Sequence, residues 1–206
     1  MSRLIKSRSQ RSTSLEYYVQ KNAISTHNCV YKLKEIGMKQ FTDYVIHETD
    51  WKNPVRLDLN MRRGISYPKD SGSAAAYNLK YMNGSFQPVF RDMAVANVRH
   101  YLNLLNRYVL GLSSRKIRKH QGTFCCIPVV EKNPDGRFHT HISLDLPSSI
   151  KYSDFKPEAK RLWARTNLSY GNTNITKLYA PEGYIGYQFK FKNRFDDIIV
   201  SELKLR

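Results

Sequence analysis

The fold of this chain is decided by residues 137–146, which read Arg-Phe-His-Thr-His-Ile-Ser-Leu-Asp-Leu. From residue 139 onward every second side chain is polar, and these are His139, His141, Ser143 and Asp145. The positions between them are apolar except for Thr140. Because successive side chains of a strand point to opposite faces, this alternation predicts a β-strand with one polar face and one face in a core.

A second strand is expected upstream, from Thr123 to Glu131, and it is joined to the first by Asn133-Pro-Asp-Gly136. The proline presets φ for a turn, and the glycine accepts the positive φ that turns often need. The two segments therefore form a hairpin. Pro128 inside the upstream strand has no N–H donor, which favours a bulge or an edge position in the sheet.

The rest of the chain supplies elements that complete a sheet. We expect a strand at 55–61, a long amphipathic helix at 90–112, a helix around 155–165, a short strand at 174–179, and a helix that begins at Pro181 and runs to about residue 192. Elements in this order favour an α+β fold, in which an antiparallel sheet has helices packed on one face.

Composition divides the chain into an extension and a domain. Residues 1–50 begin with a Ser/Arg/Lys tail and carry only short helical signals, so we expect a basic N-terminal extension that is partly mobile. Residues 51–206 hold the strands and helices named above and form the domain. A loop insertion is expected at about 64–88, where glycine, proline and serine recur.

The charge of the chain indicates a polyanionic partner. Lys and Arg total 34 against 17 Asp and Glu, which gives a net charge of +17. Such a surplus repels itself unless nucleic acid or an anionic membrane surface neutralises it. No apolar run is long enough to span a membrane, and we expect no secretory signal, because the basic N-terminal residues lack its apolar run. The three cysteines lack metal-ligand spacing, so we expect a reduced, cytoplasmic protein.

Two histidines on one strand face predict a metal site. His139 and His141 lie two residues apart, roughly 6.5–7 Å between Cα atoms, and imidazoles at that spacing can converge on one cation. Glu131 lies on the partner strand, where it can approach His139. Two histidines and a carboxylate leave open positions for a substrate oxygen. A solvated pair of histidines remains the alternative, because one His-x-His motif is weak by itself.

The expected final helix carries Tyr184, Tyr187 and Lys190, which lie three residues apart and share a face. A tyrosine with a lysine one turn further along suits covalent phosphoryl transfer. The hydroxyl can attack phosphorus, and the ammonium can stabilise the negative charge. The alternative is a structural aromatic stripe that includes Phe191.

Three segments, in this order, resemble the motifs of the HUH endonucleases, most closely the rolling-circle replication initiators (Rep proteins) of plasmids and single-stranded DNA phages. They are Leu-Asp-Leu-Asn at 57–60, Glu131 with Phe-His-Thr-His-Ile-Ser-Leu at 138–144, and Tyr-Ile-Gly-Tyr-Gln-Phe-Lys at 184–190. Thr140 stands where the family carries a hydrophobic residue between the histidines. The resemblance covers roughly residues 53–195.

The resemblance implies a ferredoxin-like antiparallel sheet with the histidine pair on a central strand and the tyrosine on an adjacent helix. It implies a Mg²⁺ or Mn²⁺ ion held by His139, His141 and Glu131. It also implies a nick in which a tyrosine attacks phosphorus, leaving a 5′-phosphotyrosine and a free 3′-OH. Such a protein nicks and rejoins DNA at a replication origin.

Tyr187 is the preferred nucleophile under this resemblance, because it carries Lys190 at the family spacing. Some initiators use two catalytic tyrosines, so Tyr184 is kept as a second candidate. Both tyrosines and the lysine are therefore predicted to belong to the catalytic group.

The expected substrate is single-stranded DNA or an origin hairpin. A basic run is expected to hold the phosphate backbone, and its residues are Arg115, Lys116, Arg118 and Lys119. Asp58 and Asn60 of the first motif are further candidates for DNA contact. The sequence has no GxxxxGK[ST] motif, so unwinding is assigned to a helicase, and synthesis to a polymerase, of a bacterial host cell.

Three alternatives share parts of this pattern. A transposase of the same superfamily would use the same chemistry. A two-histidine phosphoesterase acting on RNA needs two His-x-Ser/Thr motifs, and His141-Ile-Ser143 has only His47-Glu-Thr49 as a second. A non-catalytic basic DNA-binding module would have solvated histidines and core tyrosines, and it would bind no divalent metal.

Overall fold

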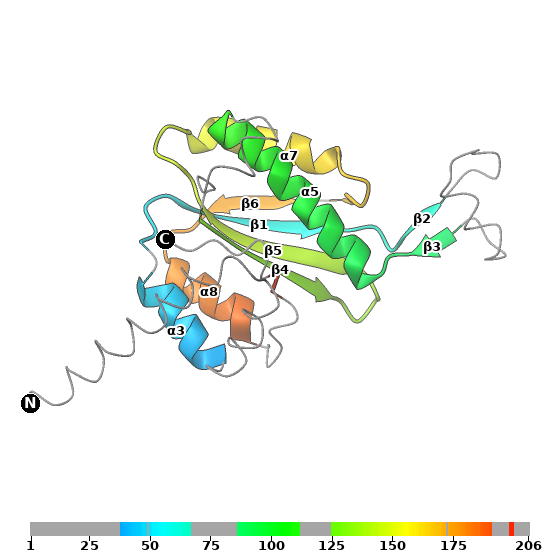
Figure 1. Ribbon diagram of the computed structural model, residues 1–206, viewed down its shortest axis with the longest axis horizontal. Coiled ribbons are helices and arrows are strands. Elements are labelled where there is room, and N and C mark those ends of the chain that lie inside the picture. The colour runs from blue at the N-terminus through cyan, green and yellow to red at the C-terminus, as the bar shows by residue number, and fades with distance from the viewer. Residues whose placement is uncertain are drawn as a thin grey trace, which may run out of the picture.

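A four-stranded antiparallel sheet lies at the centre of the structure (Figure 1). The computed structural model of the protein describes residues 38–48, 50–66, 86–111, 125–171, 173–190 and 198–199. The strands are β1 (Pro54–Asn60), β4 (Cys126–Lys132), β5 (Phe138–Asp145) and β6 (Asn174–Lys177), and their order across the sheet is β4-β5-β1-β6. This confirms the antiparallel α+β architecture and puts the histidine strand β5 in the interior of the sheet.

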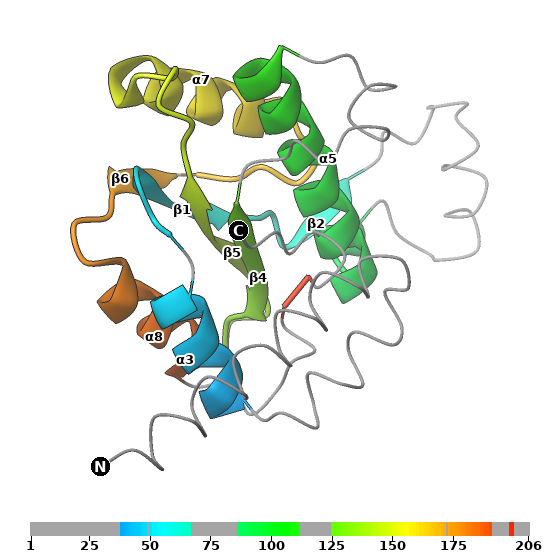
Figure 2. The ribbon, with the colours of Figure 1, turned by 60° about the vertical axis from the view of Figure 1, so that its left-hand side comes forward.

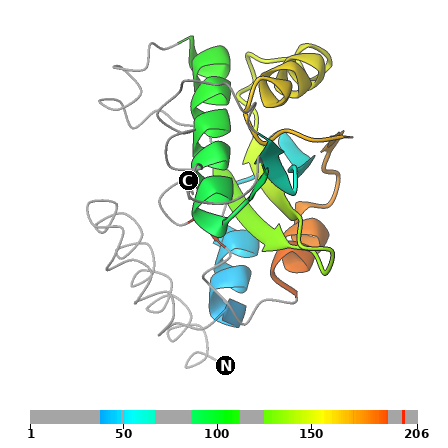
Figure 3. The ribbon, with the colours of Figure 1, turned by 90° about the vertical axis from the view of Figure 1, so that its right-hand side faces the viewer.

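Helices cover both faces of this sheet. They are α5 (Arg91–Leu110) and α7 (Tyr152–Ala164) on one face, and α3 (Met38–Glu48) and α8 (Pro181–Lys190) on the other. Figure 2 shows the sheet between the two pairs, and Figure 3 shows α3 and α8 together at the end of the molecule away from α7. The prediction of helices on one face was therefore wrong.

The reason lies in β4, which is apolar on both of its faces. Cys126 and Val130 pack in the main core with β1, β5, α5 and α7. Ile127 and Val129 point the other way, into a second cluster with residues of α3 and α8 such as Phe41. A strand that is apolar on both sides needs cover on both sides.

Residues 38–48 belong to the folded domain, because they contribute to this second cluster. The sequence put them in the N-terminal extension, but they form α3, and the ring of Phe41 meets that of Phe189 on α8 at 5.5 Å between centroids. Residues 1–37, which include the basic tail, lie outside the described residues. The folded part of the chain therefore includes a helix that precedes residue 50.

The hairpin of β4 and β5 forms as its turn predicts. The backbone N–H of Asn133 donates to Arg137 at 2.7 Å, and Gly136 has a φ of +85°, which favours glycine. Pairing runs without a bulge from Cys126 opposite Leu144 to Lys132 opposite Phe138. β4 is an edge strand of the four-stranded sheet, which agrees with Pro128 inside it.

A small hairpin frames the expected insertion. Its strands are β2 (Gly64–Ser66) and β3 (Phe86–Pro88), which pair antiparallel and project from one end of the sheet (Figure 1). A Cβ atom at Gly64 would lie 2.3 Å from the ring of Phe86, so only glycine fits there. Residues 67–85, most of the expected insertion, lie outside the described residues.

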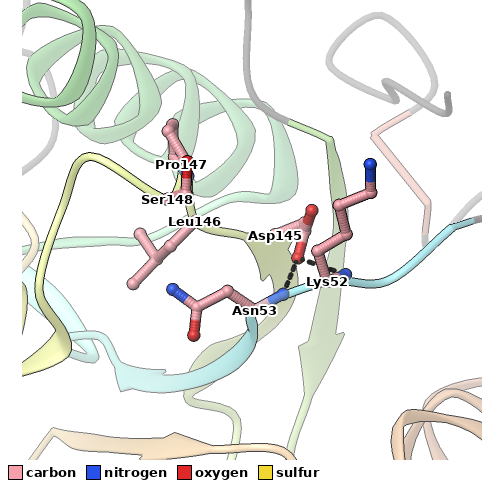
Figure 4. A pocket seen from close by; sticks show the side chains of 6 residues that line it. All are labelled: Lys52, Asn53, Asp145, Leu146, Pro147 and Ser148. Atoms are coloured by element: carbon pink, nitrogen blue, oxygen red, sulfur yellow. Dashed lines mark hydrogen bonds between the residues drawn. The ribbon is translucent and has the colours of Figure 1, made fainter.

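Asp145, the last residue of β5, holds the segment that leads into β1. Its Oδ1 accepts hydrogen bonds from the backbone N–H of Asn53 at 2.6 Å and of Lys52 at 3.0 Å, as Figure 4 shows. Asp145 is only 3% exposed, so these two donors satisfy a buried carboxylate.

None of the described helices is both long enough and apolar enough to cross a membrane.

Candidate metal centre and adjacent tyrosines

Glu131, His139 and His141 form a compact group on the polar face of the sheet. Oε2 of Glu131 lies 3.0 Å from Nε2 of His139 and 3.8 Å from Nε2 of His141. One ligand atom from each of the three residues lies within 4.8 Å of the other two, so the group could hold a metal ion. The pairing of Glu131 opposite His139 brings the carboxylate there, as the hairpin predicted.

Asp58 orients the ring of His141. The two residues lie opposite each other on β1 and β5, and Oδ1 of Asp58 is 2.8 Å from Nδ1 of His141. An imidazole that donates from Nδ1 keeps the lone pair of Nε2, and that atom faces Glu131. A carboxylate behind a histidine is the arrangement that fixes the tautomer of metal ligands and raises their basicity.

The Asp58 carboxylate is held by four neighbours. Oδ1 also accepts the hydroxyl of Tyr184 at 2.6 Å, while Oδ2 faces Arg56 at 3.3 Å and Asn174 at 3.2 Å. Burial alone would raise the pKa of Asp58, but the hydrogen bonds from His141 and Tyr184, with the charges of His141 and Arg56, lower it below its usual value. Asp58 is therefore ionised at neutral pH.

His139 is neutral at neutral pH, as a metal ligand must be. Burial, followed by repulsion from His141, lowers its pKa from 6.5 to about 4. Its Nδ1 is buried and has no hydrogen-bond partner among the described residues. Its Nε2 lies 3.0 Å from Oε2 of Glu131, so without a metal the ring proton is on Nε2 and is donated to that carboxylate. A cation bound to Nε2 would take the place of this proton.

The lowered pKa of His139 predicts that the metal-free protein loses stability in mild acid. The folded-state pKa of about 4 lies below the ordinary 6.5, so between these values the unfolded chain binds more protons than the folded one. The contribution is fully present above pH 6.5 and is lost as the pH falls to about 4. Urea unfolding in EDTA across this window measures it, and His139→Gln should flatten the dependence. An unchanged pH profile in that variant would contradict the prediction.

Tyr184 is buried and committed to Asp58. It is 8% exposed, and its hydroxyl also lies 3.4 Å from Nδ1 of His141. Burial, the charge of Asp58 and the hydrogen bond to it raise the pKa of Tyr184 far above its usual value. The phenol therefore stays protonated and acts as a hydrogen-bond donor.

Tyr187 has the opposite environment. Its side chain is 54% exposed, and no hydrogen bond among the described residues involves its hydroxyl. Its ring centroid lies 6.3 Å from that of His141, and it stacks on Tyr184 at 6.4 Å. A half-exposed tyrosine ring thus lies beside the three-ligand group. Lys190 ends α8, but its side chain lies outside the described part of the chain.

A buried hydrogen bond connects α8 to β5. The hydroxyl of Ser143 on β5 donates to Oε1 of Gln188 at 2.6 Å, and both residues are fully buried. Ile185 and Phe189 pack beside it against α3 and β4. The alternation of β5 put Ser143 on the histidine face, but nothing in the sequence paired it with Gln188.

The structure describes only two of the residues predicted to bind DNA. Arg115, Lys116, Arg118 and Lys119 lie outside the described residues. Asn60 is exposed at the end of β1, opposite His139. Asp58 has a different role from the one expected, because its carboxylate faces protein groups on both oxygens.

The chain matches no known protein family, no curated protein and no solved structure. Its chemistry is therefore inferred from its own residues. The site joins a group of three ligands suited to a divalent cation, a carboxylate that orients one of them, and an exposed phenol beside them.

Proposed function

We propose that the chain is a replication initiator of the HUH type, which nicks and rejoins single-stranded DNA at an origin through a covalent 5′-phosphotyrosine on Tyr187. The observation that carries this proposal is the half-exposed Tyr187 ring, 6.3 Å from the ring of His141 in the three-ligand group. A transposase of the same superfamily would use the same arrangement.

The topology of the sheet supports this proposal. Apart from the small β2–β3 hairpin, the elements from β1 to β6 follow the order β-α-β-β-α-β. That order is the ferredoxin-like motif, and it is the fold that the resemblance to HUH endonucleases implies. Histidines on an interior strand and tyrosines on a neighbouring helix also agree with the resemblance.

The donor set fits Mg²⁺ or Mn²⁺. Glu131, His139 and His141 would hold the ion, with Mn²⁺ better suited than Mg²⁺ to two imidazoles. Three protein ligands leave positions for substrate oxygens, and Asp58 already fixes the ring of His141. When bound, the ion supplies Lewis-acid polarisation of the scissile phosphate.

The residues of the chain would then carry out an in-line exchange at phosphorus. As the bond from the Tyr187 hydroxyl oxygen to phosphorus forms, the bond from phosphorus to the 3′ oxygen breaks. The phenolic proton passes to solvent, which reaches the half-exposed ring, and the leaving 3′ oxygen takes up a proton. Lys190 is one turn beyond Tyr187 on α8, a spacing that suits stabilisation of the charge on phosphate.

The covalent intermediate keeps the energy of the broken bond. One phosphodiester is exchanged for another, so the same residues can run the reaction backwards and rejoin the strand without ATP. A protein of this kind would work in the cytoplasm of a bacterial host cell, where a host helicase would open the duplex and a host polymerase would extend the free 3′-OH.

The test is a covalent adduct assay. The full chain is incubated with labelled single-stranded oligonucleotides that contain candidate origin hairpins, in Mn²⁺ or in EDTA, and is then denatured. We expect a labelled band at the mass of protein plus DNA that appears only with the metal. A protein that binds these oligonucleotides and gives no such band in Mn²⁺ would be a non-catalytic binding module.

Asp58→Asn is expected to weaken Mn²⁺ binding by about 10- to 100-fold. The amide keeps the shape of the carboxylate, but it loses the negative charge that raises the basicity of His141 and receives its Nδ1–H. Calorimetric titration with Mn²⁺ measures the affinity, and thermal unfolding of the metal-free variant shows whether it folds. A folded variant that binds Mn²⁺ as tightly as the parent chain would remove Asp58 from the metal centre.

A further inference from the structure

The polar face of the sheet continues beyond the metal centre. Arg137 lies two residues before His139, roughly 6.5–7 Å away along the same chain. The backbone N–H of Met61 donates to Phe138 at 3.0 Å, so the pairing of the two chain segments extends past the end of β1. Continued by one more residue, this pairing would set Arg62 opposite Arg137, on the face that carries His139.

Tyr170 joins this end of the face. Its backbone N–H donates to the carbonyl of Asn60 at 3.1 Å, and Asn60 is the residue opposite His139. The Tyr170 ring is 46% exposed, and the guanidinium carbon of Arg137 lies 4.8 Å from its centroid. An aromatic ring and a planar cation are thus held together one residue pair beyond the metal centre.

Each arginine has one contact through its Nε. Nε of Arg62 donates to the carbonyl of Ser169 at 2.9 Å, while Nε of Arg137 forms an ion pair with Oδ2 of Asp135 at 3.4 Å and no hydrogen bond among the described residues. Within the described part of the chain, the terminal nitrogens of Arg62 and Arg137 have no hydrogen-bond or ion-pair partner. Guanidinium groups held in this way present N–H donors in the fork geometry that phosphate oxygens accept.

We infer that Asn60, Arg62, Arg137 and Tyr170 form a nucleotide subsite, in which the base next to the scissile phosphate stacks on the Tyr170–Arg137 pair and the arginines bind the flanking phosphates. This inference rests on the proposed function, because it takes the scissile phosphate to lie at the metal centre. Stacking of bases on aromatic side chains beside basic residues is how proteins hold single strands without reading their sequence.

Charge distribution supports this occupant. The candidate metal centre carries two carboxylate side chains, Glu131 and Asp58, so DNA phosphates need cations close by. Arg62 and Arg137 lie at the end of the face that Tyr170 occupies, and Arg63 is the next residue along the chain. Asp135 is the carboxylate in contact with Arg137 and, at 3.9 Å, with Arg63. The cluster therefore has a surplus of positive charge where an incoming strand would leave the metal centre.

The test measures binding in the Tyr187→Phe background, which lacks the proposed nucleophile. Fluorescence anisotropy with a labelled single-stranded oligonucleotide should show about 5- to 100-fold weaker binding for Tyr170→Ala and near-parental binding for Tyr170→Phe, which keeps a ring. Tyr179→Ala is the matched control, because Tyr179 is 93% exposed and lies past the opposite end of the sheet. Tyr170→Ala binding within about twofold of the control would overturn the subsite.

The arginines give a second readout that does not depend on the ring. Arg137→Gln should weaken binding and lower the slope of log affinity against log salt concentration by about one. An Arg137→Gln chain that folds and keeps the full salt slope would remove that arginine from the phosphate contacts, even if Tyr170→Ala binds weakly.

The placement is tested with 5-iodouracil at successive positions of the oligonucleotide. Irradiation should crosslink Tyr170 to a base within one or two nucleotides of the bond that the wild-type adduct identifies. A wild-type chain that forms the adduct but crosslinks Tyr170 only to distant bases would overturn the subsite and leave the proposed function standing. If binding depends on the Tyr170 ring but the wild-type chain forms no adduct, the proposed function would be overturned and a site for single-stranded DNA at Tyr170 would stand.

Discussion

Tyr187→Phe is expected to abolish the covalent protein–DNA adduct, with a loss of at least about a thousandfold in rate, since the group that forms the new bond is gone. The substitution removes one oxygen from a half-exposed side chain, so it leaves the packing of α8 intact. Denaturing electrophoresis of the protein with labelled oligonucleotide and Mn²⁺ measures the adduct. Thermal unfolding should show the same midpoint for both chains.

Tyr184→Phe is the matched control for this result. It removes the same atom from the same helix, but that hydroxyl donates to Asp58 at 2.6 Å and is buried. We expect this variant to keep forming the adduct and to lose about 1.5–3 kcal/mol of stability, the value of a hydrogen bond to a charged group. An adduct that persists in Tyr187→Phe and disappears in Tyr184→Phe would make Tyr184 the nucleophile.

Replacing either histidine of the metal centre should have the second large effect. His141→Ala and His139→Ala each remove one of three ligands, and we expect each to weaken Mn²⁺ binding by more than about 100-fold, beyond the loss from removing an outer-shell partner. Adduct formation should fall in parallel at low Mn²⁺ and recover in part when Mn²⁺ is raised. Calorimetry and the adduct assay measure the two quantities.

His100→Ala is the control for the histidine variants. His100 is exposed on α5, on the opposite face of the sheet, so its loss removes an imidazole without touching the metal centre. Equal Mn²⁺ binding by His100→Ala and His141→Ala would mean that the three-ligand group is not a metal site. The proposed chemistry would then lack its cation.

The parts of the site that the sequence predicted are those fixed by local geometry. The alternation of β5 put His139 and His141 on one face, and the tight turn at 133–136 set the register that brings Glu131 opposite His139. A turn of defined length leaves little freedom in how two adjacent strands pair. The candidate metal group was therefore predictable from one stretch of about fifteen residues.

The parts that the sequence did not predict depend on distant pairings. Asp58 meets His141 across 83 residues, and Gln188 meets Ser143 across 45, with no turn that fixes either register. Asp58 therefore looked like a surface contact for DNA. The sequence did indicate that helices would pack on this face of the sheet. Ile127 and Val129 lie on the face of β4 that carries Glu131, and apolar residues there predict that other elements, here α3 and α8, bury them.

The shared carboxylate of Asp58 has a thermodynamic consequence. Because one oxygen receives both the ring of His141 and the hydroxyl of Tyr184, ordering either partner favours the geometry that the other needs. Under the proposed function, occupancy of the candidate cation site and docking of α8 would be linked, and linkage between two equilibria is reciprocal. A DNA strand joined to Tyr187 that displaced α8 would then lower the affinity for the cation, and a bound cation would in turn hold α8 in place.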